Sequence, residues 1–362
     1  TLEQAGFQVQ VLKDRKWYRL SPSIRILCMA DSYQDSMLLL EINGRLVINT
    51  NDAMEFGRVP FIRRMTKKYP TSLLLSISGW GSADMSNLFS EDGRFVGTPE
   101  LLDRTPIGRT NATKTERFGA THFIPFSSFH WYQRSDSAWA NQYIANLSDF
   151  YTGFQSSLCR GLPAFISYDC ESDTYVSLNP KELALDIQKP EAFGDDWNAP
   201  LVNSEFKRVE QYFRAIQHMG SFLDFVRFRV GGEDHSIEWK KNGFKRGITF
   251  EVPKQSLMTC VDYEIFDDLL IGNFMKTTLH GHWGQTGLYP DFSPYVGKYA
   301  DNGRAKTEVE VQAYFAAYER RSLDYWWTCR KERMTRFMVK NVSHDSPLYK
   351  LARLIYRRLS RA

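Results

Sequence analysis

The segment MLLLEINGRLVINTND, residues 37–52, decides which fold this chain can adopt. Two apolar runs flank the dipeptide Asn43-Gly44, which supplies the two positive φ angles that a type I′ turn requires. The segment therefore predicts a β-hairpin with strands over residues 37–42 and 45–49. Because the second strand leads into Thr50-Asn51-Asp52, we expect the carboxylate of Asp52 just beyond the end of a buried strand.

The sequence on either side of the hairpin predicts further strands and a helix. Apolar and polar residues alternate over 7–11 and again over 24–28, with the period of half-buried strands. Residues 54–68 favour a helix. The continuous apolar run at 73–78 is typical of a fully buried strand, and 122–126 predicts one more. Alternating strands and helices make this part of the chain α/β.

Composition and periodicity divide the chain into four parts. We expect a first domain over 1–150, a linker over 151–202, an α+β domain over 203–300 and a basic helical tail over 301–362. Within the first domain, residues 91–115 are rich in Gly, Pro, Asp and Thr and are expected to form a loop. The α+β domain is expected to contain helices at 204–218, after Pro253 and at 262–274, and strands at 222–230, 235–239 and 247–252.

Charge, apolar runs and cysteines limit the classes of protein. The net charge of +4 hides a basic tail. From Arg330 onward ten Lys and Arg face only two acidic residues. No apolar run approaches the roughly 18–20 residues of a membrane span, and no signal-peptide pattern opens the sequence. The five cysteines form no C-x-x-C, so neither a disulfide framework nor a structural zinc site is expected. These features favour a reducing, cytoplasmic location.

Asp35-Ser36-Met37-Leu38-Leu39 opens the hairpin region, and Asn49-Thr50-Asn51-Asp52 closes it. This order resembles the pattern D-S-x-L-L-x-x-x-G-x-x-x-x-N-x-N-D of the metallo-β-lactamase superfamily. It is closest to the branch with lactonase-like hydrolases and CMP-N-acetylneuraminate hydroxylase. The segment from Phe123 to Phe129 is similar to the family's IPFASF segment beside the active site. With the strand at 73–79 and residues 2–7, the resemblance covers about 145 of the 362 residues.

The resemblance implies the C-terminal part of an αββα sandwich and a metal site. In the family the last Asp of the pattern binds the metal pair, so Asp52 is the expected ligand. The family's H-x-H-x-D-H motif lies before the hairpin and does not occur here, and we expect the chain to begin after it. Two further family histidines fall near Asp31 and near His130, which are the candidates at those places. The expected metal is zinc, with iron or manganese as alternatives.

The expected ligands also have structural explanations. Asp52 can instead cap the turn after its strand by accepting bonds from backbone N–H groups. His130 lies among aromatic residues and can be a packed histidine. His280-Gly281-His282 looks like the start of a zinc motif, but the residues that follow lack its Asp and second His. A packing or cleft-lining role is the expectation there.

No catalytic residue is assigned by the sequence, but three residues near the IPFASF-like segment are candidate contacts for a small-molecule substrate. Asn141 stands where this branch of the family often carries Asn. Arg134 is a candidate contact for an anionic group, with a solvated loop as the alternative, and Trp131 offers an aromatic surface.

The second half of the chain contributes two weaker expectations. The α+β domain resembles a sterol-carrier-like module, which implies an apolar tunnel or a wall that covers the substrate. In the tail, apolar residues at helical spacing over 348–359 would lie on the side of a helix opposite to five Lys and Arg residues. Such a helix can lie on an anionic membrane surface or dock on the body of the protein. Nucleic-acid binding is not expected, because no recognisable nucleic-acid-binding fold accompanies the charge.

The function that the resemblance implies is metal-dependent hydrolysis. We expect the residues present here to be inactive alone, because the H-x-H-x-D-H half is missing. The alternatives are an iron-dependent redox enzyme on the same fold and a non-catalytic descendant that binds a lipid or a glycan.

Overall fold

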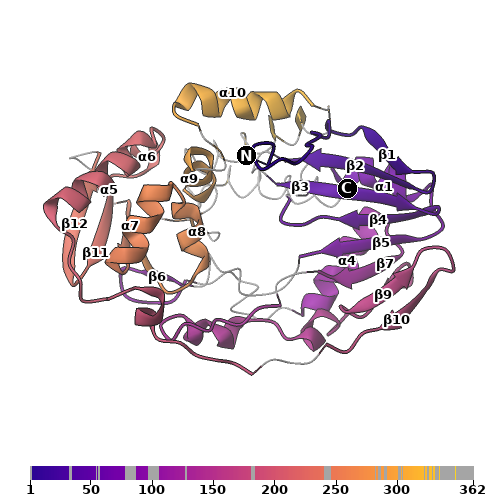
Figure 1. Cartoon of the computed structure of the whole chain (residues 1–362), viewed down its shortest axis with the longest axis horizontal. Coiled ribbons are helices and arrows are strands. Elements are labelled where there is room, and N and C mark those ends of the chain that lie inside the picture. Colours follow the sequence, from indigo (N-terminus) through magenta and orange to yellow (C-terminus); the bar gives the residue numbers. More distant parts are fainter. Residues whose placement is uncertain are drawn as a thin grey trace.

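The computed structural model describes most of the chain up to residue 321. The described residues are 2–31, 35–53, 55, 58–77, 87–96, 106–126, 129–180, 184–239, 246–281, 283, 287–288, 292–300, 303, 305–321 and single positions between 323 and 347. In that part the protein is a mixed α/β structure with two mixed sheets, one of seven strands and one of five (Figure 1).

The first sheet contains the strands nearest the N-terminus. Its spatial order is β1 (Trp17–Ser21), β2 (Ile24–Ala30), β3 (Ser36–Ile42), β4 (Arg45–Asn49), β5 (Ser72–Ser76), β7 (His122–Pro125) and β8 (Arg160–Gly161). The strands from β1 to β4 pair antiparallel, and those from β4 to β8 pair parallel. The predicted hairpin is therefore the point where the sheet changes from antiparallel to parallel pairing.

The turn of this hairpin has the predicted geometry. Asn43 and Gly44 join β3 to β4 with φ angles of 48° and 74°. Both angles lie in the left-handed region, which Asn and Gly tolerate best. The alternating burial of β3 and β4 confirms that one face of the hairpin is directed into a core.

Replacing Gly44 by valine should strain this turn. A β-branched side chain at a φ of 74° should lower the free energy of unfolding by about 1–2 kcal/mol, although the space around Gly44 is open. Urea unfolding measures the change. Val47→Thr on β4 is a control for the strand itself. A turn variant as stable as the wild type would show that the hairpin does not depend on this geometry.

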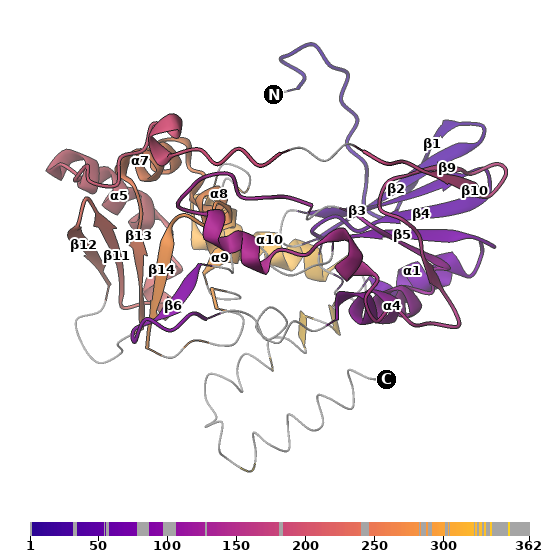
Figure 2. The ribbon, with the colours of Figure 1, turned by 90° about the horizontal axis from the view of Figure 1, so that it is seen from below.

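Two helices cover one face of the first sheet. They are α1 (Val59–Thr66) and α4 (Ile107–Phe118), which lie beside each other (Figure 2). Their buried residues Ile62, Met65 and Phe118 pack with the inward residues of the strands, among them Leu39 and Ile48. The opposite face is partly covered by the hairpin of β9 (Ile166–Asp169) and β10 (Thr174–Ser177), which packs near Leu73 and Ile124.

The second sheet draws one strand from far away in the sequence. Its order is β12 (Glu233–Glu238), β11 (Phe225–Val230), β13 (Gly247–Glu251), β14 (Lys276–His280) and β6 (Leu88–Ser90). β6 pairs parallel with β14. The sheet therefore joins residues of the predicted first domain to the predicted α+β domain. Conversely, β8, from the predicted linker, completes the first sheet.

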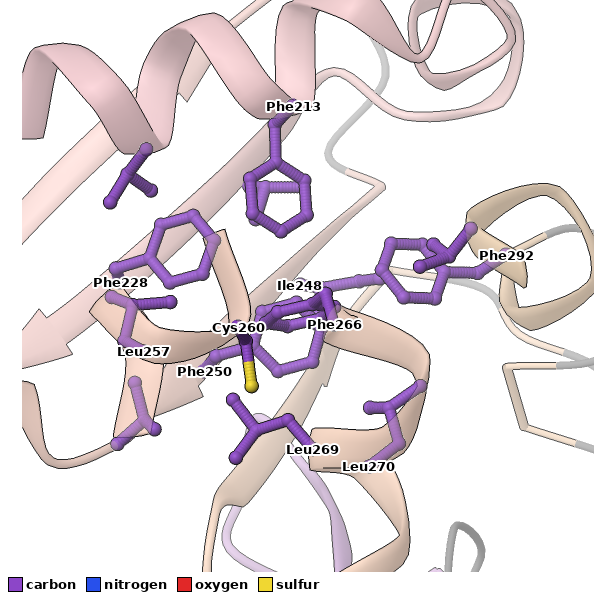
Figure 3. Close-up of a cluster of buried hydrophobic side chains, with 14 of the residues drawn as sticks. Phe213, Phe228, Ile248, Phe250, Leu257, Cys260, Phe266, Leu269, Leu270 and Phe292 are labelled. Carbon is purple, nitrogen blue, oxygen red and sulfur yellow. The ribbon is translucent and has the colours of Figure 1, made fainter. Parts of the chain in front are cut away.

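Helices pack on one face of the second sheet. They are α5 (Asn203–Ala215), α6 (Met219–Phe222), α7 (Lys254–Tyr263), α8 (Phe266–Ile271), α9 (Ser293–Tyr299) and α10 (Glu308–Glu319). Figure 3 shows the phenylalanine-rich core that results, with Phe213 from α5, Phe266 from α8, and Phe228 and Phe250 from the sheet. Short 3-10 helices lie between β7 and β8 at Ala138–Tyr143 and Leu147–Phe150, and between β10 and α5 at Pro190–Phe193.

Three expectations about local structure are wrong. Residues 7–11 form no strand, and Phe7, Val9 and Val11 are exposed, because the alternating segment has no sheet neighbour. Residues 107–115 form most of α4 and not a loop. The predicted helix at 262–274 is reduced to α8, since Glu264 adopts a left-handed φ that ends α7. The tail segment over 348–359, which is expected to be helical, lies outside the described residues.

The two sheets form separate cores. Buried residues of the first sheet pack with α1 and α4, whereas those of the second sheet pack with α5 to α10. The expectation of an α/β chain is thus confirmed at the level of mixed sheets with helices. The αββα sandwich and the four-part division of the chain stay predictions.

Candidate active site

Three aspartates lie at one edge of the first sheet. Asp31 directly follows β2, Asp35 directly precedes β3, and Asp52 follows β4 by three residues. Because β2, β3 and β4 are consecutive antiparallel strands, these three positions occur at the same end of the sheet. We call Asp31, Asp35 and Asp52 the carboxylate edge.

Hydrogen bonds fix two members of the carboxylate edge. The Asp35 N–H donates to Asp31 Oδ1 at 3.0 Å, and the Asp31 N–H donates to the Asp35 carbonyl at 2.7 Å. Asn51 Nδ2 donates to Asp35 Oδ1 at 3.0 Å, which ties the loop after β4 to the same carboxylate. The loops that carry the three side chains are therefore held together by the ends of the strands.

The carboxylates of the edge repel one another. Asp31 is 1% exposed. Burial raises the pKa of Asp35, and the charges of Asp52 and Asp31 raise it further. Asp52 reaches solvent but is flanked by protein, and this partial burial together with the charge of Asp31 raises its pKa as well. A raised pKa means that each carboxyl holds its proton to a higher pH than a free aspartate does.

The charge of a buried lysine in the second half of the protein acts on this edge. Lys298 is on α9 and is 2% exposed. Burial lowers the pKa of Lys298 to about 8, against the opposing charges of Asp31, Asp267 and Asp35. The same interaction lowers the pKa of Asp35 in return. The ammonium of Lys298 and the carboxylates of Asp31 and Asp35 therefore attract each other electrostatically.

Helix α10 connects Lys298 to the first sheet. The Lys298 ammonium lies 4.8 Å from the centre of the Tyr314 ring and 5.9 Å from that of Phe315, both on α10. Beyond the end of α10, Arg321 forms an ion pair with Asp14 at 3.6 Å. Asp14 Oδ1 in turn accepts the N–H of Ala30, the residue before Asp31, at 3.0 Å. Figure 1 shows α10 running between the two sheets.

A second cation lies behind the edge. Arg58, at the start of α1, is 2% exposed and donates through Nη2 to the carbonyl of Ala30 at 2.6 Å. The Arg58 guanidinium is thereby fixed next to Ala30, the residue before Asp31. The site thus combines three carboxylates with two buried cations, one from each half of the protein.

Of the predicted metal ligands, the structure brings Asp31 and Asp52 together but does not join His130 to them. Burial alone lowers the pKa of His130, with no contribution from either aspartate. Its ring packs edge-on against Tyr132, with centroids 5.0 Å apart. The ligand roles of all three residues stay predictions.

The predicted substrate contacts differ in how far their polar groups are already used. The amide of Asn141 accepts the N–H of Tyr132 at 2.8 Å and donates to its carbonyl at 2.9 Å, so it fixes that segment. Arg134 binds the carboxylates of Asp136 and Asp195, the latter at 2.6 Å. Trp131 is 49% exposed and is the one of the three that presents open surface.

His280 of the sequence His280-Gly281-His282 is held by neighbouring strands. Its Nε2 lies 2.8 Å from Thr249 Oγ1, and its Nδ1 lies 3.2 Å from Glu91 Oε1. Both ring nitrogens therefore have partners, one on β13 and one directly after β6. His282 lies outside the described residues.

The carboxylate edge does not by itself complete a metal site. Asp31, Asp35 and Asp52 offer hard oxygen donors, which suit divalent cations. However, in the described part of the chain no group of three or more His, Cys, Asp or Glu side chains is arranged to hold a metal ion. Among the described residues, Arg58 contacts the carbonyl of Ala30 beside Asp31, and the charge of Lys298 interacts with those of Asp31 and Asp35.

Two residues of this site were not selected from the sequence. Asp35 belongs to the motif that opens the hairpin. It lies directly before the strand that pairs with the strand leading to Asp52, and this position was the sequence signal that could have identified it. Lys298 is a single charge in the run PYVGKYA, residues 294–300, between Val296 and Tyr299, which are both buried. A lone cation inside a run that otherwise packs into a core is the pattern that marks it.

Among the described helices, none is long and apolar enough to cross a membrane. No protein family, no curated protein and no solved structure matches this chain. The resemblance to the metallo-β-lactamase superfamily therefore stays a prediction.

Proposed function

We propose that this chain has the function of a hydrolase that acts on a small molecule, and that its reacting face is the carboxylate edge. The observation that carries the proposal is the meeting of Asp31, Asp35 and Asp52 at one end of three strands, with raised pKa values for Asp35 and Asp52. Carboxyl groups with raised pKa values exchange protons more readily near neutral pH, which hydrolysis requires of its acid and base.

Asp31 and Asp52 differ in how far their side chains are exposed to solvent, and this difference determines the role that we propose for each. Asp52 reaches solvent, so its carboxylate can accept a proton from a water molecule beside a bound substrate. Asp31 is buried and acts through its charge on Asp52. Lys298 and Arg58 supply positive charge that favours negative charge developing on the substrate.

The metal belongs to the same proposal through the resemblance alone. Zinc, or iron or manganese in its place, would supply an activated water at the edge. Asp52 and Asp31 would be its carboxylate ligands, and the described residues do not complete the set. The C-terminal part of an αββα sandwich is likewise proposed, supported by the order of β3, β4, Asp52, β5 and β7 along the chain. We place the reaction in the cytoplasm.

One observation favours a second candidate, a non-catalytic binding protein on the same scaffold. Lys298 is buried and its charge interacts with those of Asp31 and Asp35, at the edge where the enzymes that the chain resembles use a metal. A descendant that has lost its metal would keep the edge as a binding surface only.

Replacing Asp52 by asparagine tests the hydrolase proposal. In the purified protein, this isosteric change should lower kcat/KM about 100-fold for any ester, lactone or phosphodiester that the wild type hydrolyses. Asp196→Asn, which changes an exposed aspartate in a turn, should leave the rate unchanged. Hydrolysis that survives in Asp52→Asn, or a wild type that hydrolyses none of these classes with zinc or manganese added, would remove the edge from the active site.

A further inference from the structure

We propose that this chain pairs with a second copy of itself through β10, so that the two β9–β10 hairpins join into one continuous antiparallel sheet. The twofold axis of the pair passes at Val176, in the middle of β10. The inference concerns the hairpin of β9 and β10 and does not depend on hydrolysis at the carboxylate edge.

Strand β10 is exposed along its whole length. Each of its residues, from Thr174 to Ser177, is open to solvent, and the side chain of Val176 is 67% exposed. Among the described strands, β10 pairs with β9 alone. Figure 1 shows β10 at the margin of the molecule, outside β9. The second edge of β10 is therefore accessible to another chain.

The register of the hairpin determines which backbone groups this open edge presents. The Leu178 N–H donates to the Phe165 carbonyl at 2.8 Å, so these residues form a hydrogen-bonded pair that continues the register of β9 and β10. Such pairs recur at every second residue of an antiparallel ladder, so Val176 also bonds to β9. The N–H and C=O groups of Tyr175 and Ser177 therefore point away from β9, toward the open edge.

The other described strands at a sheet edge carry features that oppose pairing, such as charge, irregular register or shortness. β1 contains Arg19, after which its register shifts. β12 has three acidic residues, β9 ends in Asp169, and β8 has two residues. The free side of β6 is bridged by Phe95. Among these edge strands β10 alone is uncharged, regular and open.

The backbone of β10 is complementary to itself. When two copies lie antiparallel with the Val176 residues opposite each other, Tyr175 of one copy lies opposite Ser177 of the other. Both residues have outward N–H and C=O groups, so each such pair exchanges two hydrogen bonds. Because the strand contains no charged residue, pairing identical strands places no like charges opposite each other.

The side chains favour the same arrangement. Val176 and Leu178 share one face of the hairpin, and Leu178, which is 52% exposed, is paired with Phe165. The Phe165 ring centre lies 5.7 Å from that of Phe129, so the apolar surface continues beyond the hairpin. In the paired sheet this surface would extend across the axis into the second copy. A sheet of more than two strands is also more stable than an isolated hairpin.

A charge placed on the axis tests the pairing. The interface of two short strands is small, so we expect a dissociation constant of about 10–100 µM, measured by sedimentation equilibrium of the purified protein. Val176→Lys would place two ammonium groups on strands about 5 Å apart and should weaken dimerisation tenfold or more, without a change in Tm. Leu158→Lys, at a leucine that is 73% exposed outside the hairpin, should leave the dissociation constant unchanged.

Disulfide formation tests the register independently. Val176→Cys should give a disulfide-linked dimer on mild oxidation, because residues opposite each other on the axis have Cα atoms about 4.5 Å apart. Leu178→Cys is the matched control, since the two Leu178 positions would lie about 14 Å apart along the strands, too far for a disulfide. The wild type measures any linkage through native cysteines such as Cys170, which is partly exposed.

Three results would overturn the inference. They are a wild type that stays monomeric up to about ten times the expected dissociation constant, a dimer that Val176→Lys does not weaken, and a Leu178→Cys variant that cross-links as readily as Val176→Cys. A loss of hydrolysis with the dimer intact would instead leave this inference standing, because the two proposals concern different surfaces.

Discussion

Replacing Phe250 by alanine should lower the free energy of unfolding by about 3–5 kcal/mol. Phe250 lies in β13 and is fully buried. Its ring centre is 5.7 Å from that of Phe228, 5.1 Å from that of Phe266 and 5.7 Å from that of Phe292 (Figure 3). Truncation would leave a cavity that these rings cannot fill, because strands and helices on all sides hold them.

Urea unfolding followed by tryptophan fluorescence measures this change, with Phe7→Ala as the matched control. Phe7 is 63% exposed, so the same truncation there should change the stability by less than about 0.5 kcal/mol. Equal losses in the two variants would contradict the assignment of Phe250 to the core. They would also argue that residues near Phe7 are packed and not exposed.

Replacing Arg134 by alanine should cost about 3–5 kcal/mol, because it removes one partner of a buried ion pair. The Arg134 guanidinium lies 2.6 Å from Asp195, whose side chain is 1% exposed, and 3.8 Å from the centre of the Phe274 ring. Asp195 also accepts the backbone N–H of Ser256, in the first turn of α7, at 2.8 Å. Without the arginine, a buried carboxylate would keep only the donors of Ser256.

An exposed arginine separates this effect from a general loss of positive charge. Arg214 pairs with Glu210 on the surface of α5, and Arg214→Ala should cost about 1 kcal/mol or less. In the double variant Arg134→Ala/Asp195→Asn part of the loss should be recovered, since the unpaired charge is gone. A loss for Arg134→Ala no larger than that for Arg214→Ala would show that the Asp195 pair is solvated.

The hairpin could be predicted from the sequence because all its determinants are local. Asn43-Gly44 fixes the turn, and the apolar runs beside it fix the strands. The prediction of a strand at 7–11 is wrong, because the alternation of apolar and polar residues predicts only which face of a strand would be buried. It does not state that a neighbouring strand exists to bury it, and Val11 is 82% exposed.

Helix α4 was missed for the opposite reason. Its sequence contains Gly108 and several threonines, which have low helix propensity. Burial of Phe118 in the core of the first sheet and of Ile107 against Ala145 and Phe150 overrides that propensity, and Gly119 ends the helix with a φ of 71°. Such tertiary stabilisation leaves no local signal.

The residues of the candidate site likewise divide into those that the local sequence predicts and those that only the fold brings to the site. Asp52 follows from the hairpin, and Asp31 from the resemblance, because both lie within one short segment of chain. Lys298 comes from more than 240 residues further along, and only the folding of α9 and α10 against the edge gives it a role. His130 was proposed from the resemblance, and the place of a family histidine along the sequence does not determine which groups its side chain meets in space.

The parallel pairing of β6 with β14 constrains how the chain is made. Asn87, directly before β6, donates to the carbonyl of Met275, which is 188 residues later. During synthesis the partner of β6 therefore does not exist until most of the chain has been translated, and β6 must wait unpaired. Contacts of such large sequence separation slow folding, and an unpaired strand is a site for intermolecular pairing. Dividing the gene between the segments that encode β6 and β14 would prevent these two strands from pairing within either product. Neither half should therefore be soluble when it is expressed alone.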